Sequence, residues 1–182
     1  SLHPEFSFLP RKFKIAVTGA PHDRAAVKVH DIGLRLHKND AGEIGWEVIV
    51  GGGLGRTPMV GVTVRDFLPQ HELIGYLEAI MRVYNLYGRR DNKYKARIKI
   101  LVHEIGADKF KSEVEAEYAR RPHPTTEVEE RELARIAAYF APPAFEKLPR
   151  WSASFEEAKL ANPAFARWAK NNLGPHRIDG YA

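Results

Sequence analysis

Leu9-Pro10-Arg11-Lys12-Phe13-Lys14 runs directly into the apolar segment Ile15-Ala16-Val17. Side chains alternate between the two faces of a β-strand, so a strand here would place its apolar residues on one face and Lys12 and Lys14 on the other. Two ammonium groups side by side repel each other unless an anion lies close to both. We therefore predict a strand over roughly residues 11–19, with an anion near the two lysines. The face expected to pack on the core carries Phe13, Ile15 and Val17.

The basic face also has ordinary structural explanations. Charged side chains cover the solvated face of many antiparallel sheets, and lysines protect exposed strand edges from aggregation. A surface that follows nucleic-acid phosphates is a further explanation, and a site for a small anion is another. The pattern alone leaves all of these open.

Composition narrows the functional classes. The 182 residues suffice for one domain with a hydrophobic core, or for a domain with an appendage. The absence of cysteine excludes disulfides, thiolate metal ligands and cysteine nucleophiles within this chain. A net charge of +5 permits anionic partners without indicating nucleic acid. The histidines show no metal-ligand spacing, so no metal site is predicted.

No apolar run reaches the roughly 18–20 residues of a membrane span, and no signal peptide is visible, so we expect a cytoplasmic protein without membrane contact.

Hydrophobic periodicity predicts an α+β fold with a mixed or antiparallel sheet covered by helices. Residues 32–36 and 46–50 alternate around the turn Lys38-Asn39-Asp40-Ala41-Gly42, which indicates a β-hairpin. The other expected elements are a strand over residues 59–65 and helices over residues 69–88, 94–105 and 108–120.

A glycine-rich loop, Gly51-Gly52-Gly53-Leu54-Gly55-Arg56-Thr57-Pro58, follows the hairpin. Glycine permits positive φ and a close approach of backbone N–H groups to a ligand, so such a loop can bind carboxylates or phosphates. The spacing fits neither a P-loop nor a dinucleotide fingerprint. A flexible connection explains the loop equally well.

The most basic part of the chain and its C-terminal part are interpreted structurally. Residues 89–99 carry several Arg and Lys side chains, for which we predict a solvated helix face rather than a binding groove. Beyond the candidate linker Arg121-Pro122-His123-Pro124, proline-separated short helices bearing aromatic residues indicate an arm that packs on another surface. We expect two parts, an α+β lobe over residues 1–121 and a helical extension over residues 122–182.

Over about residues 6–120, the chain resembles the sirohaem-containing nitrite and sulfite reductase haemoprotein family in three features, which follow one another along the sequence. They are the L-P-R-K-F-K stretch at residues 9–14, the G-G-G-L loop at residues 51–54, and Phe67-Leu68-Pro69 before a long helix. The resemblance implies the α+β lobe of that family that lacks the cluster cysteines. Such enzymes reduce sulfite to sulfide, or nitrite to ammonia, by six electrons on a sirohaem coupled to a 4Fe-4S cluster.

By this resemblance, Lys12 and Lys14 bind the substrate anion and donate protons to it, and Arg11 is a weaker substrate-binding candidate. The implied cofactor contacts are Gly51, Gly52, Gly53 and Arg56. Sirohaem and the cluster belong to the parent enzyme, and we expect neither to bind this chain alone. The chain is then an inactive fragment whose partners are the remaining lobes, a ferredoxin or flavoprotein electron donor and a small oxyanion, with no nucleic acid.

The alternative is a small basic module that binds RNA or another polyanion. It would use Lys12, Lys14, Arg56 and the basic residues within 89–99. No RNP-type or G-x-x-G motif supports it. The sequence does not distinguish sulfite from nitrite as the substrate, or a ferredoxin from a flavoprotein as the electron donor.

Overall fold

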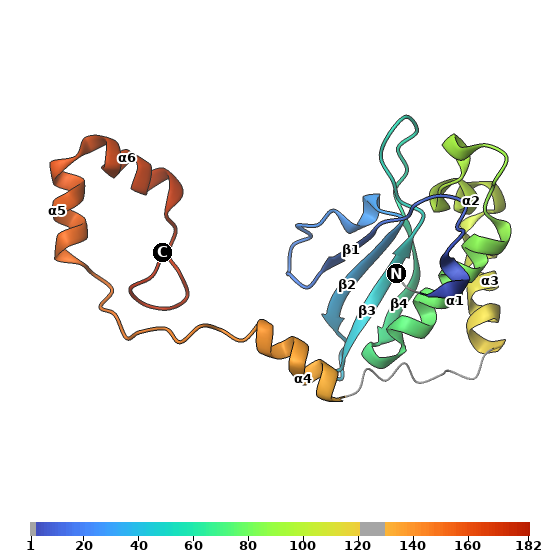
Figure 1. Ribbon diagram of the computed structural model, residues 1–182, viewed down its shortest axis with the longest axis horizontal. Helices are drawn as coiled ribbons and strands as arrows, with labels where there is room; N and C mark the ends of the chain where they lie inside the picture. The colour runs from blue at the N-terminus through green and yellow to red at the C-terminus, as the bar shows by residue number, and fades with distance from the viewer. Residues whose placement is uncertain (1–2, 121–129) are drawn as a thin grey trace. The chain divides into compact units, whose positions relative to one another are not determined.

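The computed structural model describes residues 3–120 and 130–182, and the chain forms two compact units, residues 1–127 and 128–182 (Figure 1). The candidate linker at residues 121–124 and the expected boundary after residue 121 lie outside the described residues. Each unit is therefore considered by itself.

The first unit contains a four-stranded mixed sheet in the order β1-β2-β3-β4. β1 pairs in parallel with β2, whereas β2 with β3 and β3 with β4 are antiparallel. The predicted hairpin is confirmed, because β2 and β3 pair in full register around a turn in which Gly42 has φ +82°. The strands are β1 (Ile15–Thr18), β2 (Ile32–Lys38), β3 (Ile44–Val50) and β4 (Val62–Pro69).

Three helices cover one side of this sheet, and the core lies between the two layers (Figure 1). They are α1 (Leu73–Tyr87), α2 (Ile98–Ile105) and α3 (Ala107–Arg120). Alternate residues of the strands contribute one half of the core, and one face of each helix contributes the other. The predicted α+β fold with a mixed sheet covered by helices is thus confirmed. Short 3₁₀ helices occur at η1 (Pro4–Phe6), η2 (Val27–Val29), η3 (Gln70–Glu72) and η4 (Lys93–Lys95).

The opening strand is shorter than predicted. β1 begins at Ile15, so Lys12 and Lys14 precede it rather than lie on it. Side chains from elsewhere in the fold bond the backbone of residues 11 and 14, and β2 bonds this segment only at the carbonyl group of Lys14. The helix expected from residue 69 begins at Leu73, because Pro69 ends β4 and a 3₁₀ turn intervenes.

Two residues expected in the core are instead exposed. Ile15 and Val17 are aligned with Ile32 and Leu34 across the parallel pairing, so they share the face that carries the core. Ile32 and Leu34 are buried, but Ile15 is 41% and Val17 53% exposed. The reason is position, because β1 is an edge strand of the sheet.

The second unit consists of α4 (Glu130–Tyr139), α5 (Ala153–Ala161) and α6 (Pro163–Asn172). Asn162 caps α6 by accepting hydrogen bonds from the backbone N–H groups of Ala164 and Phe165. Phe155 and Phe165 pack edge to face, with ring centroids 5.7 Å apart. Among residues 3–120 and 130–182, no helix is both long and apolar enough to span a bilayer.

Candidate functional site

The basic segment at residues 11–14 presents its charges to solvent. The side chains of Arg11, Lys12 and Lys14 are exposed, and they make no hydrogen bond or ion pair within the described part of the chain. Phe13, between the two lysines, packs against the core. The segment therefore carries three cations whose charges are not neutralised by described neighbours.

The backbone of this segment is held at its start by Tyr84 of α1. The buried Tyr84 hydroxyl lies 2.9 Å from the carbonyl oxygen of Arg11 and 2.8 Å from that of Ala96. Its single proton is donated to one of these carbonyls at a time. Burial raises the pKa of Tyr84 to about 12, so the hydroxyl stays a donor at neutral pH.

The end of the segment is held by Asp31, whose side chain is fully buried. Its Oδ2 accepts a hydrogen bond of 3.0 Å from the backbone N–H of Lys14. Arg97 donates to both carboxylate oxygens, at 3.0 Å and 2.7 Å. This bidentate pairing satisfies a charge that would be costly to bury alone. The carbonyl oxygen of Asp31 also accepts a 3.0 Å hydrogen bond from Gly51 N–H. Asp31 thus connects the two parts of the sequence predicted to bind ligands.

Backbone conformation and close packing within the chain account for the first three glycines of the loop. Gly51 has φ +90°, which strains any other residue. A Cβ atom on Gly52 would lie 2.6 Å from the carbonyl oxygen of His30, and one on Gly53 would lie 2.9 Å from Cδ of Lys99. All three glycines are buried, and their contact with a cofactor stays a prediction.

The rest of the loop, between β3 and β4, projects beyond the sheet and carries Arg56 (Figure 1). Arg56 is exposed and has no bonded partner among the described residues. Lys99 of α2 lies at the base of the loop, is 7% exposed, and donates to the carbonyl oxygens of Leu54 and Thr57. Desolvation lowers the pKa of Lys99, the Arg97 charge lowers it further, and Asp31 acts in the opposite direction.

The prediction that residues 89–99 form a solvated face is therefore wrong for Arg97 and Lys99, because both side chains bond groups inside the fold. Arg89 forms ion pairs with Asp91 and Glu104. Arg90 donates to the carbonyl oxygens of Phe8 and Asn85. Many of the cationic side chains that a polyanion-binding surface would have used are thus bonded to other groups of this chain.

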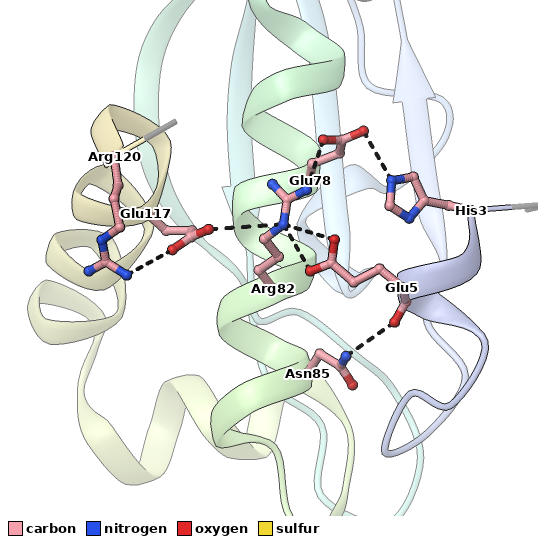
Figure 2. A network of polar contacts seen from close by, with 7 residues as sticks. All are labelled: His3, Glu5, Glu78, Arg82, Asn85, Glu117 and Arg120. Atoms are coloured by element: carbon pink, nitrogen blue, oxygen red, sulfur yellow. Dashed lines mark hydrogen bonds and ion pairs between the residues drawn. The ribbon is translucent and has the colours of Figure 1, made fainter. Parts of the chain in front are cut away.

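The segment preceding the basic residues is also docked on the helices. Figure 2 shows Arg82 of α1 between Glu5 and Glu117 of α3, with Nε 2.9 Å and 3.9 Å from their carboxylates. Arg82 also pairs with Glu78, and Asn85 donates to the carbonyl oxygen of Glu5. These contacts fix the chain before it reaches residue 9.

Sequence reasoning missed Asp31 and Tyr84, and it misassigned Arg97. The contacts from Asp31 to Lys14 and from Tyr84 to Arg11 span 17 and 73 residues, and that between Arg97 and Asp31 spans 66. No local motif encodes pairings at such separations. The one available signal was an acidic residue placed directly before the apolar strand at Ile32.

The chain is similar in sequence to several sulfite reductases. The chain is 38% identical over 137 residues to a "Sulfite reductase [ferredoxin]" from Synechococcus elongatus, covering 70% of this chain and 22% of that protein. It is 36% identical over 114 residues to a "Sulfite reductase [NADPH] hemoprotein beta-component" from Staphylococcus haemolyticus, covering 59% of this chain and 20% of that protein. The solved structure of the NirA protein from Mycobacterium tuberculosis matches with a TM-score of 0.60 and 34% identity, over 65% of this chain and 21% of that one. The chain thus spans about a fifth of the length of these relatives.

The model of the nitrite and sulphite reductase 4Fe-4S domain family matches residues 1–122. The cluster in the family's name does not fit this chain, because the sequence has no cysteine to supply a thiolate. No group of three or more His, Asp or Glu side chains within residues 3–120 and 130–182 is placed to hold a metal ion. The family match nevertheless covers the whole α+β unit up to the end of α3, and the chain belongs to the nitrite and sulphite reductase 4Fe-4S domain family.

Proposed function

We propose that this chain is one lobe of a sirohaem-dependent sulfite or nitrite reductase, in which Lys12 and Lys14 bind the substrate oxyanion. The supporting observation is that the backbone of residues 11–14 is fixed at both ends while both ammonium groups are exposed and unpaired within the described residues. A cation carried on a fixed backbone meets an anion with less reorganisation than one on an unanchored segment, although its side chain must still order.

The chemistry needs groups of this kind. Reduction removes the oxygens of the anion as water, which requires protons at each oxygen that leaves. An ammonium group attracts the negative charge and has N–H bonds that can supply such protons. Sirohaem, when bound in the parent enzyme, supplies the electron chemistry. This lobe contributes anion binding and protons, with Arg11 as a further cation and Arg56 as a contact to the cofactor.

The relatives guide the remaining choices. Each is named a sulfite reductase, so sulfite is the favoured substrate, with nitrite as the alternative. One relative is named for ferredoxin and the other for NADPH. The electron donor is accordingly a ferredoxin or a flavoprotein, and the isolated chain is inactive because the cluster and the other lobes are supplied by the rest of the parent enzyme.

The second unit is proposed to pack on that remaining part. Among its described apolar side chains only Ala169 is buried. Large exposed apolar surfaces of this kind mark interaction sites. The most exposed of these large side chains are Tyr139, Phe140, Trp151 and Leu160.

The test is to replace Lys12 and Lys14 with Met, singly and together, in the full-length reductase. Each single change should lower turnover of sulfite by about 100-fold, the typical loss on removal of one oxyanion-stabilising donor. Lys38→Met is the matched control, because Lys38 is an exposed lysine at the end of β2 without a bonded partner among the described residues. Unchanged turnover and sulfite affinity in the double variant would refute the assigned role.

A second measurement tests the parent enzyme itself. The gene product purified at its natural length should show sirohaem bands in its visible absorption spectrum. A colourless protein that binds RNA, with an affinity that falls steeply as salt rises, would favour the polyanion-binding alternative.

A further inference from the structure

The two lysines lie on a short span with a buried anchor at each end. Tyr84 holds the carbonyl group of Arg11 at 2.9 Å, and Asp31 holds the N–H group of Lys14 at 3.0 Å. The carbonyl group of Lys14 in turn accepts a 3.1 Å hydrogen bond from Ile32 at the start of β2. Only three peptide units separate residue 11 from residue 14, so both lysine Cα atoms are held relative to the core.

Anchoring the backbone of residues 11–14 matters because the two lysines proposed to bind the anion carry charges of the same sign. Two neighbouring ammonium groups repel each other, and long lysine side chains lose rotamer freedom when they close on a ligand. A backbone already fixed in place removes part of that ordering cost and limits how far repulsion can separate the two residues.

The anchors themselves do not oppose the anion. Tyr84 and Asp31 are both fully buried, so neither reaches a ligand at the surface. The Asp31 carboxylate would repel an oxyanion near Lys14, but Arg97 compensates its charge through two hydrogen bonds. Arg97 thus allows a carboxylate to serve as an anchor beside an anion site.

We propose that Asp31 and Tyr84 are positioning residues that hold the backbone of residues 11–14 so that Lys12 and Lys14 converge on one oxyanion. This inference rests on the proposed function and extends it to two residues that never touch the substrate.

The primary variant is Tyr84→Phe, which removes only the hydroxyl group that the carbonyl groups of Arg11 and Ala96 share. Tyr76→Phe is the matched control, because Tyr76 is equally buried on the same helix and donates to Glu115 instead. In the full-length reductase, Tyr84→Phe should weaken sulfite binding about three- to tenfold, as expected for one lost hydrogen bond. Tyr76→Phe should leave the affinity within about twofold. Asp31→Asn, which weakens the anchor at Lys14, should also weaken sulfite binding, and an unchanged affinity in this variant would overturn the role of Asp31.

A merely structural role is separated from positioning by a double-mutant cycle. In the Lys12→Met/Lys14→Met background, Tyr84→Phe should cause no further loss of sulfite affinity, because the residues through which it acts are gone. In this chain by itself, Tyr84→Phe should speed amide hydrogen exchange within residues 11–14 more than Tyr76→Phe does.

The outcomes separate the two proposals. If the lysine variants lose sulfite affinity but Tyr84→Phe behaves like Tyr76→Phe, the positioning role is overturned and the role of the lysines stands. If the lysine variants bind sulfite normally, both proposals fail together. An equal loss from Tyr84→Phe with and without the lysines also overturns positioning.

Discussion

At the scale of single residues, the α+β unit contains charged side chains that are buried together with the groups that bond them. Asp31 is fully buried and receives hydrogen bonds from Arg97 and the backbone of Lys14. Lys99 is nearly buried and donates to two loop carbonyl groups. An ion removed from water is tolerated only where such bonds replace its hydration. The free cations at residues 11–14 contrast with these, since their hydration is intact and available for exchange with a ligand.

Gly52→Ala tests whether internal packing alone requires the glycine loop. A Cβ at this position meets the backbone of Lys28 and His30, which cannot move as a flexible side chain would. In the isolated chain, without any cofactor, we expect a loss of about 1–3 kcal/mol in the free energy of unfolding, typical of overpacking. Gly174→Ala is the control, because nothing lies within 4 Å of its added Cβ. Urea unfolding measures both, and a fully stable Gly52→Ala protein would contradict the packing explanation.

At the scale of elements, the pairing of β1 with β2 shows that two residues with the same sequence pattern can differ in burial. Periodicity decides on which face of the sheet a side chain lies, and the position of the strand in the sheet decides whether that face is covered. Ile15 and Ile32 are aligned in register and share one face of the sheet. Their sequence pattern is the same, yet Ile32 is buried in the core and Ile15 is 41% exposed at the edge.

Truncating each of these isoleucines measures that difference. Ile32→Ala should cost about 2–5 kcal/mol in the free energy of unfolding, because it removes methyl groups from a packed core. Ile15→Ala should cost under about 1 kcal/mol, because its side chain has solvent on one side. Thermal or urea unfolding of the two variants checks this. Equal costs would show that the edge strand is covered in solution.

A second link between elements joins β4, α1 and α3 through a carboxylate. Glu115 of α3 accepts hydrogen bonds from Arg65 of β4, at 2.7 Å and 2.6 Å, and one of 2.8 Å from the Tyr76 hydroxyl of α1. Burial acts to raise the pKa of Glu115, but the hydrogen bonds and the Arg65 charge outweigh it and lower the pKa. The folded state therefore favours the ionised carboxylate.

This link predicts the acid sensitivity of the fold. The stability from Glu115 is complete above the pKa that the carboxyl group has in the unfolded chain, and it is lost as pH falls through the lower pKa of the folded state. Glu115→Gln should be less stable than wild type at pH 7 and should lose less stability between pH 7 and about pH 3. Asp40→Asn, at an exposed turn, should keep the wild-type slope. Urea unfolding at several pH values checks this, and identical slopes for Glu115→Gln and wild type would refute it.

At the scale of the whole molecule, the core and the family match coincide in one unit. Every residue of the hydrophobic core cluster lies at or before Tyr118, and the family match ends at residue 122. The second unit has helix caps and aromatic pairs but little buried apolar area among its described residues.

Removal of residues 128–182 should therefore leave the unfolding midpoint of the first unit unchanged. The truncated chain keeps the complete core cluster, and burial of apolar surface is the main source of stability. Circular dichroism during urea unfolding compares the truncated and intact chains. A clearly lower midpoint would mean that the extension contributes to the stability of the lobe.

Local patterns predicted those parts of the fold that local physics controls. Alternation around the Gly42 turn predicted the hairpin correctly, and helical spacing located α1, α2 and α3 to within a few residues. The basic segment was identified as a candidate site from the same kind of pattern. Its secondary structure was not predicted correctly, because two of the bonds that hold residues 11–14 come from the side chains of Asp31 and Tyr84, and a neighbouring strand bonds only the carbonyl group of Lys14.

The sequence by itself determined the α+β class, the hairpin, the family resemblance and the absence of cysteine ligands, since each depends on composition or on neighbours a few residues apart. Only the tertiary structure decided which charges are free and which are buried. It assigned Arg97 to Asp31 and Lys99 to the loop carbonyl groups, and it left Lys12 and Lys14 exposed on an anchored backbone. The physical reason is that the hydration or pairing of a charge depends on groups brought close by folding, and these lie up to 82 residues away along the chain.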